Sequence, residues 1–158
     1  MLALFSFCNN IDAEVCSIEC SLQLEQKETM KIRILIVDDH HSFRDVLKAL
    51  LALQTDMEVI GEAPNGQEAI VLSRKLRPDV ILMDVMMPVM DGIEATRRIL
   101  AETPDMKILA LSFYSDDGFV KGIMRAGALR YILKGDDFEV MTAAIREAAA
   151  SDNCQYMQ

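Results

Sequence analysis

Apolar residues in this chain gather in five short runs, and between these runs they recur every three or four positions. The short runs are rich in Val, Ile and Leu and are too brief for amphipathic helices, so they predict buried strands. These strands cover residues 32–37, 57–63, 80–83, 107–112 and 130–133. The run at 80–83 is entirely apolar and ends on a carboxylate, Asp84, before a loop that contains Pro88 and Gly92.

The segments with helical spacing predict five helices, one after each strand. They cover residues 42–53, 67–76, 93–100, 116–127 and 136–150. Gly127 is expected to cap the end of the fourth helix. In the first helix the apolar residues share one face, formed by Phe43, Val46, Leu47, Leu50 and Leu51. In the last helix the residues expected to face inwards are Phe138, Met141, Ile145 and Ala148.

Five strand–helix units in succession predict an α/β domain with a parallel sheet. Because crossovers between parallel strands are right-handed, helices are expected on both faces, which gives a doubly wound sandwich of three layers. Residues 1–29 show no clean period and are interpreted as an N-terminal extension. The predicted domain covers residues 30–150, and residues 151–158 form a short polar tail.

Charge and cysteine content narrow the classes of function. With 25 acidic and 16 basic residues the net charge is −9, which argues against a surface that binds nucleic-acid phosphates. Cys8, Cys16, Cys20 and Cys154 lack the spacing of a zinc site and are interpreted as free thiols in a reducing cytosol. No apolar run is long enough to span a bilayer, and the start lacks the basic residues of a signal peptide, so a cytoplasmic location is expected.

Polar residues stand at the ends of four predicted strands. Carboxyl ends of parallel strands meet at one edge of a sheet, so these residues are expected to lie together. They are Asp38, Asp39, Asp84, Ser112 and Lys134. Three carboxylates at close range repel one another unless a cation joins them, and a set of oxygen ligands suits a hard ion such as Mg²⁺. A carboxylate nucleophile beside a metal ion, a hydroxyl and an ammonium is what phosphoryl transfer onto Asp requires.

Each of these residues also has a simpler interpretation. Asp38 or Asp39 could cap the first helix, and Asp84 could cap the helix that follows it. Ser112 could be a hydroxyl at a strand end, and Lys134 a solvated charge. Their joint occurrence at four strand ends, in this order, favours one functional site over coincidence.

These residues, together with three flanking motifs, resemble the receiver domain of two-component response regulators. The motifs are Met87-Pro88 after Asp84, Met90-Asp91-Gly92, and Tyr131 three residues before Lys134. The resemblance covers about residues 30–150 and implies the flavodoxin-like strand order 2-1-3-4-5 with five helices. Residues 111–117 and 126–128 are most similar to receivers of the LuxR/NarL/FixJ-type group, which precede a DNA-binding domain.

The resemblance implies a role for each site residue. Asp84 is the phosphoacceptor. Asp39, Asp84 and the backbone carbonyl of Met86 bind Mg²⁺, with Asp38 reaching the ion through water, and Mn²⁺ could replace Mg²⁺. Lys134 pairs with the phosphoryl group.

The resemblance also implies a switch and a lifetime for the phosphorylated state. Ser112 hydrogen-bonds a phosphoryl oxygen and moves toward the phosphoryl group, while the ring of Tyr131 turns inwards. Met86 and Tyr114 beside the site cannot act as strong bases toward an attacking water, which predicts a long-lived phospho-form. His40 and His41 are interpreted as loop or capping residues rather than metal ligands.

The implied function is a signalling module that accepts a phosphoryl group from a histidine kinase or phosphotransfer protein. Phosphorylation would switch an interaction surface for a downstream protein or a homodimer, formed by residues 116–133 or by the first and last helices. No turnover of an external substrate, no membrane contact and no direct DNA binding are expected of this chain, which stops at Gln158. One alternative is a constitutive interaction module, a pseudo-receiver. A hydrolase of the haloacid dehalogenase type is disfavoured because Met86 occupies the position of its second Asp.

Overall fold

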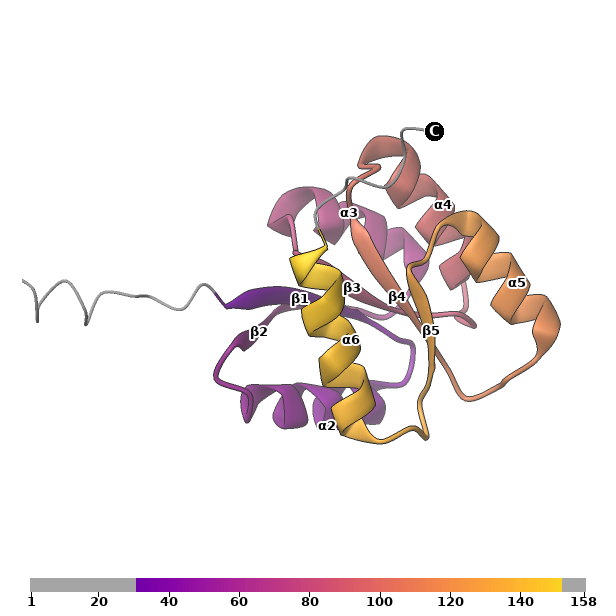
Figure 1. Cartoon of the computed structure of the whole chain (residues 1–158). Coiled ribbons are helices and arrows are strands. Elements are labelled where there is room, and N and C mark those ends of the chain that lie inside the picture. Colours follow the sequence, from indigo (N-terminus) through magenta and orange to yellow (C-terminus); the bar gives the residue numbers. More distant parts are fainter. Residues whose placement is uncertain (1–30, 152–158) are drawn as a thin grey trace, which may run out of the picture. The chain divides into compact units, whose positions relative to one another are not determined.

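The computed structural model describes residues 31–151, so the predicted N-terminal extension and nearly all of the predicted tail lie outside the described residues. Figure 1 shows a central parallel sheet with helices on both faces. The strands are β1 (Ile32–Val37), β2 (Met57–Ala63), β3 (Val80–Asp84), β4 (Lys107–Ser112) and β5 (Arg130–Leu133). The helices are α2 (His41–Ala52), α3 (Gly66–Leu76), α4 (Gly92–Glu102), α5 (Asp117–Ala126) and α6 (Phe138–Ala150). The strand order β2-β1-β3-β4-β5 confirms the predicted fold.

Successive residues of the inner strands pack into different cores, because side chains alternate between the two faces of a sheet. Ile34 and Ile36 of β1 belong to a core with α2 and α6, whereas Leu35 and Val37 belong to a core with α3 and α4. A third, smaller cluster joins Ile123 of α5 to the sheet. All residues of β3 are buried because both of its faces are covered, which explains why its sequence is apolar without alternation.

Three helices begin with a side chain that caps their free N–H groups, namely α3, α4 and, through Asp116, α5. Asn65 accepts a hydrogen bond from the backbone N–H of Glu68, and Asp91 accepts one from Glu94. Because Asp91 is the N-cap of α4, the interpretation of Asp84 as a helix cap is wrong. The N-cap of α2 is His40, so Asp38 and Asp39 do not occupy that position either. Their carboxylates therefore need another explanation.

The apolar face predicted for the first helix is wider than the face that the fold buries. Leu47 and Leu51 of α2 are buried and Phe43 is partly buried, but Val46 and Leu50 are 57% and 36% exposed. The helix packs on the sheet along a single stripe, and residues at the margins of a wide apolar arc remain in solvent. The inward face predicted for α6 is confirmed, with Met141, Ile145 and Ala148 buried.

Gly127 adopts a φ of 109° at the C-cap of α5, as predicted. Among the helices between residues 31 and 151, none combines the length and the apolar character that a membrane crossing requires.

Gly92 closes the loop between β3 and α4 directly against the strand end. Its backbone N–H donates a hydrogen bond to the carbonyl oxygen of Val85 at 3.0 Å. A Cβ atom at this position would lie 2.0 Å from the carbonyl oxygen of Asp84. Because that neighbour is backbone within a fully buried strand, it has no room to move away.

We expect Gly92→Ala to lower the free energy of unfolding by about 2 kcal/mol, since the methyl group displaces either β3 or the start of α4. Gly135→Ala is the matched control, because a Cβ at Gly135 meets no atom within 4 Å. Its effect should stay within about 0.5 kcal/mol. Urea unfolding of both variants checks the prediction, and a Gly92→Ala chain as stable as the control would contradict it.

Candidate functional site

The polar residues predicted at four strand ends meet at the carboxyl edge of the sheet. Asp38 follows β1, Asp84 ends β3, Ser112 ends β4 and Lys134 follows β5, and these four strands are neighbours in that order. The backbone N–H of Lys134 donates to the carbonyl oxygen of Ser112 at 2.8 Å, which continues the pairing of β4 and β5. The strand order therefore determines the order of the site residues.

Two buried carboxylates share one buried ammonium. Lys134 Nζ lies 2.5 Å from Asp38 Oδ2 and 3.2 Å from Asp84 Oδ1. The side chains of these three residues are at most 5% exposed. The interpretation of Lys134 as a solvated charge is wrong. Removing these charges from water is costly, and mutual attraction offsets that cost only while the contacts are kept.

Burial at the strand end raises the pKa of the Asp84 carboxyl from 3.8 to about 6. Desolvation is the main cause, and the nearby charge of Asp38 raises the pKa further. The Lys134 ammonium and a backbone hydrogen bond from Met86 act in the opposite direction. At neutral pH the group is therefore mostly an ionised carboxylate, although the fold disfavours its charge.

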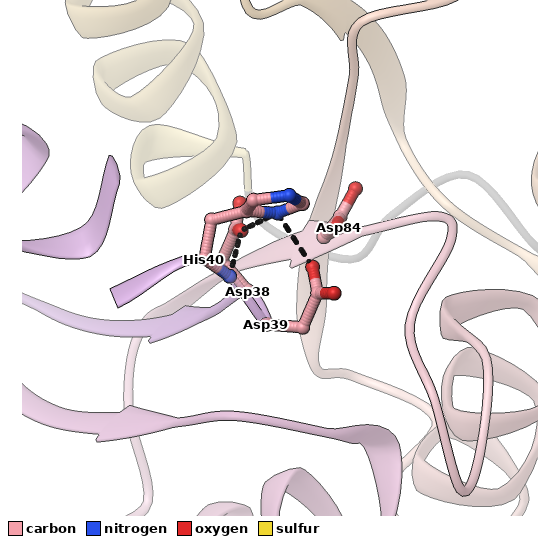
Figure 2. Close-up of side chains that lie close together, drawn as sticks. All are labelled: Asp38, Asp39, His40 and Asp84. Atoms are coloured by element: carbon pink, nitrogen blue, oxygen red, sulfur yellow. Dashed lines mark hydrogen bonds and ion pairs between the residues drawn. The ribbon is translucent and has the colours of Figure 1, made fainter. Parts of the chain in front are cut away.

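His40 lies among the acidic residues, as Figure 2 shows. Its Nδ1 is 2.7 Å from Asp39 Oδ1 and 3.4 Å from Asp38 Oδ1, and its backbone N–H donates to Asp38 Oδ1 at 3.0 Å. The prediction that His40 is a capping residue is right about its position in the chain but missed this contact. His41 Nδ1 instead pairs with Asp45 Oδ2 one turn along α2, at 2.9 Å.

The acidic residues fit a divalent cation. Ligand atoms of Asp38, Asp39, His40 and Asp84 lie within 4.8 Å of one another. Asp39 Oδ1 and Asp38 Oδ2 are buried, and neither accepts a hydrogen bond of good geometry. Asp39 Oδ1 lies close to His40 Nδ1, and Asp38 Oδ2 lies close to Lys134 Nζ. Three carboxylates and one ammonium leave two negative charges when His40 is neutral. Carboxylate oxygens and a double negative charge match a hard divalent ion such as Mg²⁺.

The two residues predicted to form the switch both contact the backbone of Tyr114. Ser112 Oγ accepts a hydrogen bond from the backbone N–H of Tyr114 at 3.1 Å. The Tyr131 hydroxyl donates to the backbone carbonyl oxygen of Tyr114. Ser112 is buried, whereas Tyr131 is partly exposed and packs beside Ile123. The shared contact with the Tyr114 backbone was not predicted, and the switch role of the two residues stays a prediction.

Two aromatic rings beside Lys134 were not predicted as site residues. Its Nζ lies 4.7 Å from the ring centroid of Phe43 and 4.8 Å from that of Phe113. The sequence placed Phe43 on the apolar face of the first helix, and Phe113 entered only as part of the motif at residues 111–117. An aromatic residue beside a polar strand end is a weak signal, because the sequence does not show where its ring points.

Comparison with known proteins gives one family. The model of the response regulator receiver domain matches residues 34–146. The transcriptional regulatory protein LiaR of Bacillus subtilis is 47% identical over 121 residues, which are 77% of this chain and 57% of LiaR. DegU of Brevibacillus brevis is 40% identical over 79% of this chain and 53% of its own length. The chain thus spans about half the length of the curated relatives it matches.

Solved structures agree with the sequence matches. A LuxR-family response regulator from Aurantimonas sp. superposes with a TM-score of 0.73 at 32% identity, over 76% of this chain and 86% of that chain. The receiver domain of the response regulator NarL from Mycobacterium tuberculosis gives a TM-score of 0.71 at 30% identity, over 77% of this chain and 98% of that chain.

We expect Asp84→Asn to stabilise the metal-free fold at pH 7.5 by about 2 kcal/mol, because it removes a charge that the fold disfavours. The unfolded carboxyl has the ordinary pKa of 3.8, and the folded one about 6. The cost of ionised Asp84 is therefore complete above pH 6 and disappears as the pH falls toward 3.8. Thermal unfolding in EDTA at pH 4 to 8 checks this.

Asp117→Asn is the control for this experiment, because the Asp117 side chain is 89% exposed. Its effect on stability should be small across the whole pH range. A gain from Asp84→Asn that is equal at pH 4 and pH 8 would show that desolvation of the charge is not the cause.

Proposed function

This chain belongs to the response regulator receiver domain family, whose members are phosphorylation-controlled modules of two-component signalling, and on that premise we propose that Asp84 is its phosphoacceptor. One observation carries the proposal: a buried carboxylate with a raised pKa stands at the end of the central strand beside a buried ammonium. The donor would be a histidine kinase or a phosphotransfer protein, which offers a phosphohistidine.

The chemistry is an in-line displacement at phosphorus. A carboxylate oxygen of Asp84 forms a bond to phosphorus while the bond from phosphorus to the imidazole nitrogen breaks. The imidazole leaves with the electron pair, and the product on Asp84 is an acyl phosphate. The Lys134 ammonium lies 3.2 Å from Asp84 Oδ1 and can offset charge on the transferred group. Ser112 ends the neighbouring strand, and its hydroxyl can donate a hydrogen bond to a phosphoryl oxygen.

We propose that Asp39, Asp84 and the backbone carbonyl of Met86 hold Mg²⁺, with Asp38 reaching it through water. Their oxygen donors and the excess of two negative charges support this assignment, and Mn²⁺ has similar ligand preferences. When bound, the ion supplies charge neutralisation at the phosphoryl oxygens. Asp39 is the carboxylate of this group that is not paired with Lys134, so it is the most available for a metal.

We propose that Ser112 and Tyr131 pass the change of charge to an interaction surface. Movement of Ser112 toward a phosphoryl group would break its hydrogen bond with the Tyr114 N–H. The carbonyl oxygen of Tyr114 accepts the hydrogen bond of the Tyr131 hydroxyl, so both residues would respond to a shift of Tyr114. The surface would be α5 with β5, where Met124 and Leu129 are exposed, or α2 with α6. A downstream protein or a second copy of the chain would bind there, and light scattering of the phosphorylated chain tests the second case.

Receiver domains are not typical turnover enzymes, and we propose that this chain phosphorylates and dephosphorylates only itself. The pseudo-receiver alternative keeps the fold without the chemistry. In a pseudo-receiver the paired charges of Asp38, Asp84 and Lys134 would have no chemical role. Burying these charges costs free energy, which counts against that alternative.

We expect acetyl phosphate and Mg²⁺ to phosphorylate the wild-type chain, which would appear as a shifted band on a phosphate-affinity gel. The band should be absent in Asp84→Asn and in EDTA, because the first lacks the nucleophile and the second the charge compensation. Asp117→Asn should be phosphorylated like wild type. A folded wild-type chain without any shifted band would support the pseudo-receiver instead.

We expect the phosphorylated chain to persist for minutes rather than seconds. Met86 and Tyr114 each stand two residues after a site residue, Asp84 and Ser112, and their side chains are exposed; neither can act as a strong base toward an attacking water. Met86→Glu places a carboxylate there and should shorten the lifetime severalfold. The loss of the shifted band over time measures both rates, and a wild-type lifetime of seconds would contradict the expectation.

A further inference from the structure

Two aromatic rings from different parts of the chain lie beside the Lys134 ammonium. Phe43 lies in the first turn of α2, and Phe113 directly follows β4. Their ring centroids are 4.7 and 4.8 Å from Lys134 Nζ, within the range of cation–π contacts. The two rings meet edge to face, with centroids 5.9 Å apart at 67°.

Core packing explains Phe43 but not Phe113. Phe43 packs against the core that α2 and α6 share, whereas Phe113 is 58% exposed. The ring contacts of Phe113 are with Phe43, with Lys134 and, at 6.4 Å between centroids, with His40. Its ring thus covers an ammonium and not an apolar core.

Lys134 needs such support because its side chain is long and its ammonium can rotate freely. Asp38 and Asp84 attract the ammonium through their carboxylates. Phe43 and Phe113 attract it through their π systems and occupy space in which water would otherwise solvate it. The Lys134 side chain is 1% exposed as a result of both sets of contacts.

We infer that Phe43 and Phe113 form an aromatic clamp that positions the Lys134 ammonium for phosphoryl transfer to Asp84. The inference rests on the proposed function and adds two positioning residues to it. The clamp holds the ammonium where negative charge develops, so no reorganisation of the lysine is needed when the phosphoryl group arrives.

The matched variants are Phe113→Leu and Phe113→Tyr. Leucine keeps much of the apolar bulk but has no π face, whereas tyrosine keeps the ring. We expect Phe113→Leu to slow phosphorylation by acetyl phosphate about three- to tenfold, with Phe113→Tyr within about twofold of wild type. Phe113→Tyr is thus the control, because it keeps an aromatic ring at the same position.

Proton NMR of Lys134 gives a readout that does not depend on phosphorylation. The methylene protons next to Nζ should show ring-current shifts in wild type and Phe113→Tyr, and these shifts should be much smaller in Phe113→Leu. Unchanged shifts in Phe113→Leu, or a Phe113→Leu chain phosphorylated as fast as wild type, would overturn the clamp. A wild-type chain that accepts no phosphoryl group, despite ring-shifted Lys134 protons, would instead overturn the proposed function on which the role of the clamp rests.

Discussion

The contact of two buried carboxylates with one buried ammonium is the constraint on which the site depends. Asp38, Asp84 and Lys134 come from three strands, and their charges are removed from water together. Each strand end must therefore stop at the same level of the sheet, since a shift of one residue would leave a charge buried without a partner. The parallel order β1-β3-β4-β5 meets this requirement. The fold thus fixes the spacing of the charges, and the charges penalise any change of register.

The sequence predicted those features that depend on backbone periodicity. Strand ends could be located because buried strands are short apolar runs, and the meeting of Asp38, Asp84, Ser112 and Lys134 follows from parallel strands alone. What it missed depends on the direction of side chains. The contact of His40 with Asp39 and the rings of Phe43 and Phe113 around Lys134 arise from rotamers that no periodicity encodes. Helical spacing grouped Val46 and Leu50 with Leu47 and Leu51, but it does not show how much of a shared face is covered.

Two consecutive residues connect the buried charges to Ser112 and Tyr131, the residues of the proposed switch. Phe113 contacts the Lys134 ammonium with its ring, and Tyr114 binds both Ser112 and Tyr131 with its backbone. The segment that carries them runs from the end of β4 to α5 and is exposed at both side chains. A rearrangement of this segment would change the surroundings of Lys134 and the hydrogen bonds of Ser112 and Tyr131 together. The same short stretch can thus link the electrostatics of the site to the shape of the surface.

The close contact of Gly92 with the Asp84 carbonyl holds the end of the central strand in place. The carbonyl of Asp84 is covered by the start of α4, and β3 is paired on both edges by β1 and β4. The central strand is therefore a fixed support, and a phosphoryl group on Asp84, as proposed, would meet a backbone that has little room to move. Two strands of the sheet are paired on one edge only, β2 and β5, and of these β5 carries Tyr131, whose side chain is partly in solvent. Under the proposed function, the change would pass from the rigid middle of the sheet to the border formed by β5.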